Sequence, residues 1–292
     1  MRILCLHGKG TSAAIFESQT FGFRHHLRTA HPSEPLAFDF VDGPILSDPA
    51  PGVDHFYEGP FYSFFETTAP KDLHVAHDWL LDLLERRGPY DGVLAFSQGC
   101  ALVASLLFEI QVEAARARLP TTAVAALQPF KFAVFICGGY PLASLTEKGY
   151  IVSDAAKAYD QQSAQALQNQ SPLNPILDKS GWPCRRDSAV GYRQEQKMDL
   201  ASIVSSSVDV CGLDLAQLND EHKIQIPTVH VYGIQDPRLG SAVQLARVCR
   251  QDRAQIASHR EGHSIPRTPG VSRMISSMIL QAIGQARNVQ DK

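Results

Sequence analysis

A chain of 292 residues, 44% of them hydrophobic, is long enough to bury one large core, so we expect a single domain spanning residues 1–292. Its formal net charge is −3, and no basic run of five or more residues occurs, which argues against a nucleic-acid partner. No apolar stretch is long enough to predict a membrane-spanning helix.

The N-terminus, MRILCLHG, has only a few apolar residues before Gly8, which predicts a first strand rather than a secretion signal. No Cys-x-x-Cys pair and no zinc spacing occur, and this favours reduced thiols over disulfides. We therefore expect a cytoplasmic protein that has no metal and no other cofactor. The six cysteines are Cys5, Cys100, Cys137, Cys184, Cys211 and Cys249.

The first predicted strand, residues 3–6, ends in the sequence HGKGTS at 7–12. Two glycines after a strand let the backbone turn sharply and expose N–H groups. A plain glycine-rich turn is the alternative, and a P-loop is excluded because Gly-Lys-Ser/Thr does not follow at the required spacing. Thr11 or Ser12 then caps a helix that extends to about Ala30.

A second strand is expected at 36–41, followed by an irregular segment at 43–65 that is rich in Pro, Gly and aromatic residues. Long loops are usually polar, so this aromatic composition is unusual. Two interpretations remain open: the segment forms the wall of an apolar substrate pocket, or it folds onto the core as a satellite cluster. The candidate pocket residues are Phe56, Tyr57, Phe61 and Tyr62.

Residues 71–87 have apolar positions at intervals of three and four, which predicts an amphipathic helix that ends at Gly88. The segment 91–107, DGVLAFSQGCALVASLL, then combines a short apolar run, a tight turn and an apolar helix. This order of strand, helix and strand predicts a mostly parallel sheet.

Ser97 stands at the sharp turn between that strand and that helix, which is the position of the nucleophile elbow in α/β-hydrolases. The usual pattern is Gly-x-Ser-x-Gly, and Ala95 replaces the first glycine here. An ordinary turn with a capping serine is the alternative. In such a fold, the backbone N–H groups of Lys9 and Gln98 would form the oxyanion hole.

Residues 131–137 predict a buried strand, after which the regular alternation of strands and helices is lost from 142 to 222. We interpret 142–222 as an insertion near the active site that serves as a lid or a dimer surface. The composition does not indicate a separate domain, and it leaves the oligomeric state open.

Residues 226–233 predict the next strand, and Asp236 follows it directly. An acid beyond a core strand and after the nucleophile in chain order is typical of the acidic triad member. Asp236 is alternatively the N-cap of a helix at 239–249. The rivals Asp209, Asp214 and Asp220 lack a clear preceding strand.

In residues 257–266, ASHREGHSIP, the Gly-His followed by Pro predicts a loop before a last helix at about 270–286. His263 is the preferred catalytic base because a loop histidine can reach across the end of the sheet. His259 is less favoured, since Gly262 and Pro266 argue against a helix that would pair the two histidines. His7 is interpreted as structural.

The order Ser97, Asp236, His263 is the hydrolase order, and it predicts a Ser-His-Asp triad on a doubly wound α/β sheet with helices on both faces. His263 would take the proton of Ser97 as the hydroxyl attacks a carbonyl, while Asp236 orients the imidazole. Water would then release the acyl-enzyme.

The chain resembles the family serine hydrolases (FSH type), which are small α/β-hydrolases frequent in fungi. The similarity lies in four segments, and it departs from the family pattern at Ala95 and at Glu261, where glycine is usual. The segments are RILCLHGKGTSAAIF at 2–16, AFSQG at 95–99, GIQD at 233–236 and GHSIP at 262–266.

The resemblance implies an esterase or thioesterase that acts beside a polyketide synthase in secondary metabolism. It would release or edit an acyl chain held on a carrier protein. A basic patch of Lys9, Arg185, Arg186 and Arg193 would dock an acidic carrier domain. The alternatives are a carboxylesterase or deacetylase for a small free ester, and a non-catalytic ligand-binding protein on the same fold.

Overall fold

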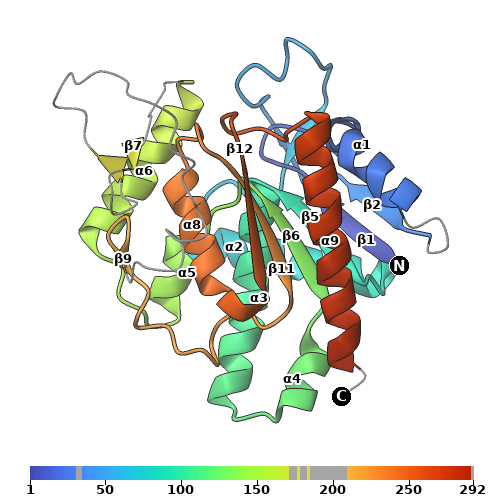
Figure 1. Cartoon of the computed structure of the whole chain (residues 1–292). Helices are drawn as coiled ribbons and strands as arrows, with labels where there is room; N and C mark the ends of the chain where they lie inside the picture. The colour runs from blue at the N-terminus through green and yellow to red at the C-terminus, as the bar shows by residue number, and fades with distance from the viewer. Residues whose placement is uncertain (31–34, 171–175, 178–182, 185–208, 291–292) are drawn as a thin grey trace.

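The computed structural model describes residues 1–30, 35–170, 176–177, 183–184 and 209–290. Its centre is a six-stranded sheet with the order β12-β11-β6-β5-β1-β2, in which every pairing is parallel (Figure 1). The strands are β1 (Arg2–Leu6), β2 (Ala37–Val41), β5 (Gly92–Phe96), β6 (Phe132–Ile136), β11 (Thr228–Gly233) and β12 (Ala254–His259).

The central strands are apolar on both faces because both faces are covered. In β5, Val93 and Ala95 belong to one hydrophobic cluster, whereas Leu94 and Phe96 belong to the other. This is the period-2 alternation of a strand, with helices on each side in place of solvent. Apolar runs therefore predicted β5 and β6 correctly, and strands were also predicted correctly at β1 and β11.

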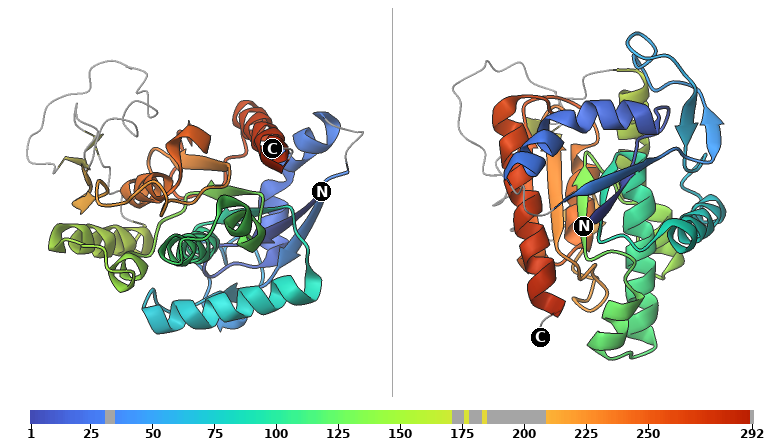
Figure 2. Two further views of the ribbon diagram at one scale, coloured as in Figure 1. Left: turned by 90° about the horizontal axis from the view of Figure 1, so that it is seen from below. Right: turned by 90° about the vertical axis from the view of Figure 1, so that its right-hand side faces the viewer.

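Helices form a layer on each face, as Figure 2 shows. Helices α1 (Ala13–Ala30) and α9 (Pro269–Gln290) pack together on one face. Helices α2 (Pro70–Arg87), α3 (Gln98–Arg116) and α8 (Leu239–Val248) cover the other. The chain therefore has the expected doubly wound α/β-hydrolase architecture.

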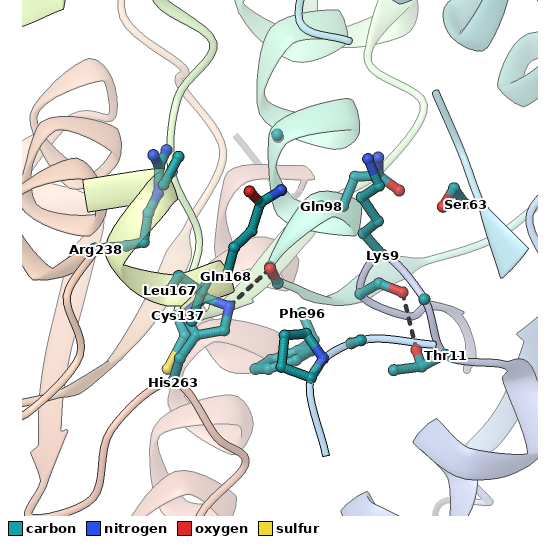
Figure 3. Close-up of a pocket in the computed structure, with 18 of the residues that line it drawn as sticks. Lys9, Thr11, Ser63, Phe96, Gln98, Cys137, Leu167, Gln168, Arg238 and His263 are labelled. Atoms are coloured by element: carbon teal, nitrogen blue, oxygen red, sulfur yellow. Dashed lines mark hydrogen bonds between the residues drawn. The ribbon is translucent and has the colours of Figure 1, made fainter. Parts of the chain in front are cut away.

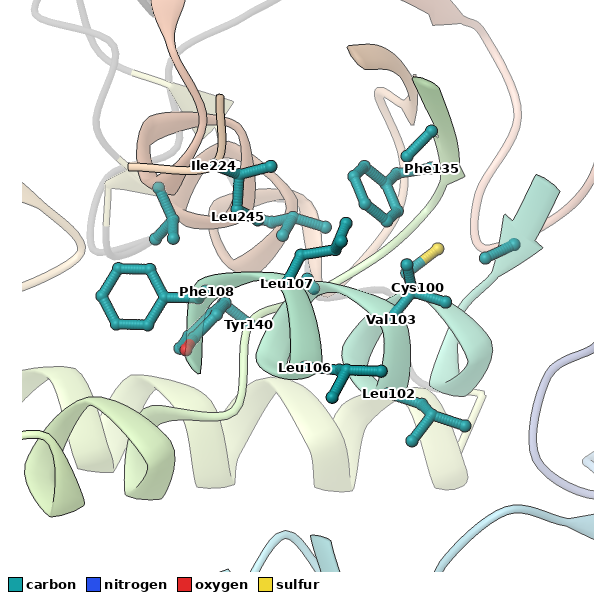
Figure 4. Packing of buried hydrophobic residues seen from close by; sticks show 14 of the residues in the cluster. Cys100, Leu102, Val103, Leu106, Leu107, Phe108, Phe135, Tyr140, Ile224 and Leu245 are labelled. Atoms are coloured by element: carbon teal, nitrogen blue, oxygen red, sulfur yellow. The ribbon is translucent and has the colours of Figure 1, made fainter. Parts of the chain in front are cut away.

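Helix α3 lies at the centre of the larger hydrophobic cluster, where Leu102, Leu106 and Phe108 are surrounded by apolar neighbours (Figure 4). Among the described helices it is the one whose length and mean hydropathy of 1.2 would suit a membrane span. Of that window, 78% is buried inside the molecule. The sequence analysis did not recognise that this helix is long and apolar enough to span a membrane. Its burial shows that α3 is a core helix.

Two elements correct the sequence analysis. The segment 43–65 is not wholly irregular, because β3 (Ile45–Ser47) and β4 (Phe61–Ser63) pair in antiparallel fashion within it. The second is strand β12 (Ala254–His259), which the sequence analysis did not predict. Its own pattern is weak, and its pairing with β11 supplies the hydrogen bonds.

The remaining described elements lie outside the main sheet. Within 142–222, helix α6 lies beside the carboxyl ends of the strands, and the interpretation of this range as an insertion stays a prediction. The elements are α4 (Thr121–Leu127), α5 (Leu142–Glu147), α6 (Asp154–Gln168), β7 (Ile176–Leu177), β8 (Pro183–Cys184), β9 (Asp209–Val210), β10 (Leu213–Asp214) and a 3₁₀ turn (Gln251–Arg253).

Candidate active site

Ser97 sits in a strained turn between β5 and α3, with φ of 50° and ψ of −109°. A positive φ is costly for a residue with a Cβ and is retained at functional turns. The turn needs close approach of β1, since a Cβ on Gly99 would lie 2.5 Å from the carbonyl oxygen of Leu6. Ala95 is fully buried two residues before Ser97, and the strained turn forms with its methyl group in place.

Ser97, His263 and Asp236 form a continuous hydrogen-bonded chain. His263 Nε2 lies 2.8 Å from Ser97 Oγ (Figure 3), and His263 Nδ1 lies 2.7 Å from Asp236 Oδ2. A carboxylate can only accept, so the Nδ1 proton is donated to Asp236. The lone pair of Nε2 is then free to accept the proton of the Ser97 hydroxyl. The three residues follow β5, β12 and β11, and thus converge at one edge of the sheet.

Asp236 is held as an anion although it is only 1% exposed. Burial on its own would raise the pKa of this carboxyl, but the charge and hydrogen bond of His263 lower it. The backbone N–H of Arg238 donates to Asp236 Oδ1 at 2.7 Å, and the Arg238 charge adds to the effect. The net result is a pKa below the ordinary value, which suits a group that must balance an imidazolium.

The backbone N–H groups of Lys9 and Gln98 have no hydrogen-bond acceptor among the residues that the structure describes. Both residues line the same cavity as Ser97. Figure 3 shows them on the side of Phe96 opposite His263. Two unpaired N–H groups across from a base are the donors that a developing oxyanion requires.

His7 fixes the loop that carries Lys9. Its Nδ1 donates to the carbonyl oxygen of Gly8 at 2.7 Å, and its Nε2 accepts from the N–H of Gly43 at 3.0 Å. Thr11 Oγ1 also donates to the Gly8 carbonyl. Burial lowers the pKa of His7, so the neutral ring that this geometry needs is favoured.

The Gln98 side chain ties the elbow to the segment after β4. Its Oε1 accepts from the N–H of Phe64 at 2.9 Å, and its Nε2 donates to the carbonyl oxygen of Phe65 at 2.7 Å. Both ends of the amide are therefore satisfied in a buried position. The sequence analysis used only the backbone of Gln98 and missed this contact.

A cavity of about 1650 Å³ opens beside Ser97. Its walls come from the loop after β1, the segment 45–53, helix α6 and the loops after β11 and β12. Aromatic surface is supplied by Phe65, Phe96 and Tyr140.

The four aromatic residues proposed for the pocket lie elsewhere. None of Phe56, Tyr57, Phe61 and Tyr62 is among the described residues that line this cavity. Phe56 is 83% exposed, and Tyr57 accepts a hydrogen bond from Arg267 at its hydroxyl. The segment does reach the cavity, through Phe65 at its end and through smaller side chains such as Ile45, Pro49 and Val53. That these residues contact substrate stays a prediction.

Two residues near the triad had no motif to reveal them. Cys137 directly follows β6 with φ of 47°, and its thiol donates to the carbonyl oxygen of Ser264 at 3.5 Å. Arg238 reaches from the Asp236 loop to helix α6. The order of strands in the sheet was the signal for Cys137, since the residue after a strand beside β5 must lie near Ser97.

The other sequence candidates are distributed as follows. His259 is buried at the end of β12 and does not contact Ser97. Asp209 and Asp214 belong to the small β9–β10 pair, and Asp220 binds Lys223. Arg185, Arg186 and Arg193 of the expected docking patch lie outside the described residues.

Comparison with known proteins found a matching family and similar esterases. A family model described as serine hydrolase (FSH1) matches residues 1–275. Esterase FPY3 of Fusarium mangiferae is 25% identical over 289 residues, which cover 97% of this chain and 99% of that protein. Esterase alnB of Emericella nidulans is 29% identical and covers 91% of each chain.

Solved structures of esterases are similar at lower identity. Esterase PE8 is 14% identical with a TM-score of 0.47, covering 96% of this chain and 92% of its own. The Bacillus cereus carboxylesterase is 14% identical with a TM-score of 0.46, covering 96% of this chain and 87% of its own.

Proposed function

The chain belongs to the serine hydrolase (FSH1) family, and from that premise we propose that it cleaves an ester or thioester with Ser97, His263 and Asp236 as its triad. The observation that supports this assignment is the hydrogen-bonded chain from Ser97 Oγ through His263 to Asp236. Hydrolase activity itself follows from the family.

In the first step, Ser97 Oγ attacks the carbonyl carbon while its proton passes to His263 Nε2, 2.8 Å away. Asp236 keeps the proton of His263 on Nδ1, so that Nε2 is the basic nitrogen. The buried carboxylate then stabilises the imidazolium that forms.

The carbonyl oxygen becomes negative as the bond to Ser97 forms. The N–H groups of Lys9 and Gln98 receive it, and each donor of this kind lowers the barrier by about 3 kcal/mol. His263 returns the proton to the leaving group, which departs as an alcohol or a thiol. Water, activated by the same histidine, then releases the acid and restores Ser97.

The substrate we propose is an acyl chain of polyketide type, held as a thioester on the carrier protein of a polyketide synthase. Two features support it: the resemblance to the fungal family, and a cavity of about 1650 Å³ that exceeds the roughly 300–1,000 Å³ usual for small ligands. The place of action we propose is the cytoplasm, since the five cysteines described as free are all buried thiols.

A fluorophosphonate probe tests the triad. Labelling should map to Ser97 and be lost in Ser97→Ala and His263→Ala. The matched control is Ser47→Ala, because Ser47 lines the same cavity and its hydroxyl donates to the carbonyl oxygen of Asp48. Absence of labelling in well-folded wild-type protein, or labelling that persists in His263→Ala, would refute an activated Ser97.

A second experiment separates the substrate classes. Acyl chains of matched length are offered as a carrier-bound thioester and as a free methyl ester. A higher kcat/KM for the carrier-bound thioester supports the proposal, and a preference for the free ester points to the alternative of a small-molecule carboxylesterase or deacetylase. Ligand binding without turnover in wild type would instead indicate a non-catalytic binding protein.

A further inference from the structure

Cys137 stands between the members of the candidate triad. It follows β6, which lies between β5 and β11 in the sheet, and these two strands lead to Ser97 and Asp236. The side chain is 2% exposed but lines the cavity. In Figure 3 its sulfur lies beside the His263 ring, away from the hydrogen bond of that ring to Ser97. No step of the proposed hydrolysis uses this thiol.

The thiol, a carboxylate oxygen of Asp236 and a ring nitrogen of His263 all lie within 4.8 Å of one another. Sulfur, nitrogen and oxygen are the three donor types that zinc takes in proteins, at about 2.0–2.3 Å from the metal. Ligand atoms on a tetrahedron of that size are about 3–4 Å apart. His263 Nδ1 and Asp236 Oδ2 already lie 2.7 Å apart, so holding an ion needs the sulfur to move toward them by at most about 1 Å.

His259 adds a second observation on the same sulfur. Its Nε2 lies 3.9 Å from Cys137 Sγ, the residue is 4% exposed, and its Nδ1 has no hydrogen-bond partner among the described residues. A buried imidazole with an unused nitrogen is uncommon, because buried polar groups are normally paired. The sulfur of Cys137 therefore has a second imidazole as a neighbour besides that of His263.

We propose that Cys137, Asp236 and His263 form a binding site for a thiophilic divalent cation such as Zn²⁺, and that occupancy of this site blocks turnover. That the ion binds is argued from these side chains alone, whereas that it blocks turnover rests on the proposed function.

Inhibition follows from where the proton of His263 must go. When His263 Nδ1 gives its lone pair to the metal, the ring proton moves to Nε2, and Nε2 no longer accepts the proton of Ser97. Cys137 releases its thiol proton to solvent and binds as thiolate. One thiolate and one carboxylate balance the two charges of the ion, and water completes the coordination. The ion in this proposal is an inhibitor and not a cofactor.

Direct binding tests the site without reference to activity. Zn²⁺ alone is titrated into wild type, Cys137→Ser and the matched control Cys249→Ser, which removes a different buried thiol. Wild type and Cys249→Ser should bind one ion with equal affinity, and Cys137→Ser should bind at least about tenfold more weakly. Equal affinity in wild type and Cys137→Ser would overturn the proposal.

Cobalt provides a measurement that needs no variant. Co²⁺ bound to wild type should give the near-ultraviolet charge-transfer absorption of a thiolate ligand, and a complex without that band would overturn the assignment of Cys137.

Ser97→Ala should bind Zn²⁺ as wild type does, since Ser97 is not a ligand. If that variant and wild type both bind zinc but neither hydrolyses any ester, the site stands and the proposed function fails.

Inhibition of ester hydrolysis by zinc is then measured in wild type and in Cys137→Ser, each relative to its own rate without metal. The zinc concentration for half inhibition should rise in Cys137→Ser by the same factor as the dissociation constant. Equal half-inhibition in the two proteins, despite different binding, would overturn the inhibitory role of this site.

Discussion

Arg238 and Asp160 form an ion pair, at 2.8 Å between Nη2 and Oδ1, that joins the loop of the candidate catalytic acid to helix α6. The same guanidinium also donates to the carbonyl oxygen of Asp160 and to Ser163 Oγ. The backbone N–H of Arg238 meanwhile donates to Asp236. One residue therefore couples the wall of the cavity to the orientation of the triad.

Replacing Arg238 by Met should disturb this coupling. We expect kcat/KM to fall about tenfold, because small displacements of a positioned group cost rate steeply. Lys157→Met is the matched control, since it breaks an exposed ion pair on the same helix. Steady-state kinetics on a model ester check this, and equal losses in both variants would show that Arg238 has no special role.

Asp236→Asn should reduce kcat by roughly 10⁴-fold while leaving the fold intact. The amide oxygen can still accept from the N–H of Arg238, but an amide NH₂ facing His263 favours the wrong tautomer. Circular dichroism and urea unfolding check the fold, and ester hydrolysis checks the rate. A loss of less than tenfold would argue that another group holds the histidine.

Gln98→Ala should lower kcat because it frees the segment after β4, at Phe64 and Phe65, from the elbow. The variant keeps the backbone N–H of the candidate oxyanion hole but loses the bonds to Phe64 and Phe65, each worth about 1 kcal/mol. Gln251→Ala is the control, because that side-chain amide also makes two hydrogen bonds to the backbone but is not among the described residues that line the cavity. Both variants should lose stability in urea, and only Gln98→Ala should lose activity.

Ala95→Gly restores the residue usual in the elbow pattern, yet it should not speed the enzyme. The turn at Ser97 already forms with the methyl group, which is fully buried in β5. Glycine in a strand costs about 0.5–1 kcal/mol, so the variant should unfold at lower urea. A tenfold gain in kcat/KM would mean that the methyl group does hinder catalysis.

His230 should make the protein sensitive to acid. Burial lowers its pKa to about 3, whereas an unfolded histidine titrates near 6.5. As pH falls from about 6.5 toward 3, the unfolded chain binds a proton that the folded chain refuses, so stability is lost across that window. At pH 5 the loss is about 2 kcal/mol.

The change that tests this is His230→Leu, compared with the exposed His25→Gln. The free energy of unfolding is measured in urea at several pH values between 7 and 4. The leucine variant should show the shallower dependence on pH, and the control should follow wild type. Parallel curves for all three proteins would rule out His230 as a source of acid sensitivity.

The sequence predicted the parts of the fold that rest on strong local patterns. Continuous apolar runs identified β5 and β6, and the order of Ser97, Asp236 and His263 predicted a chain of hydrogen bonds that the structure displays. Strand β12 was missed because its sequence, AQIASH, lacks clear alternation and its pairing partner is the neighbour β11.

Long-range contacts account for the other omissions. The contact of Arg238 with α6 joins residues 78 positions apart, and no local signal encodes it. Ile45 and Val53 line the cavity, whereas Phe56 does not. Which residues face the cavity depends on how the segment 43–65 packs against the loop after β1. Cys137 became significant only when the sheet order placed it beside Asp236.

The separation of Ser97 from His263 along the chain has a consequence for biosynthesis. The two residues are 166 positions apart, so at ~5–20 residues per second a ribosome completes the proposed nucleophile roughly 10–30 s before the proposed base. Under the proposed mechanism, Ser97 has no imidazole to activate it during that interval, so an emerging chain would not consume reactive esters. Covalent labelling of Ser97 would therefore count finished molecules, in which the last strand and helix have docked.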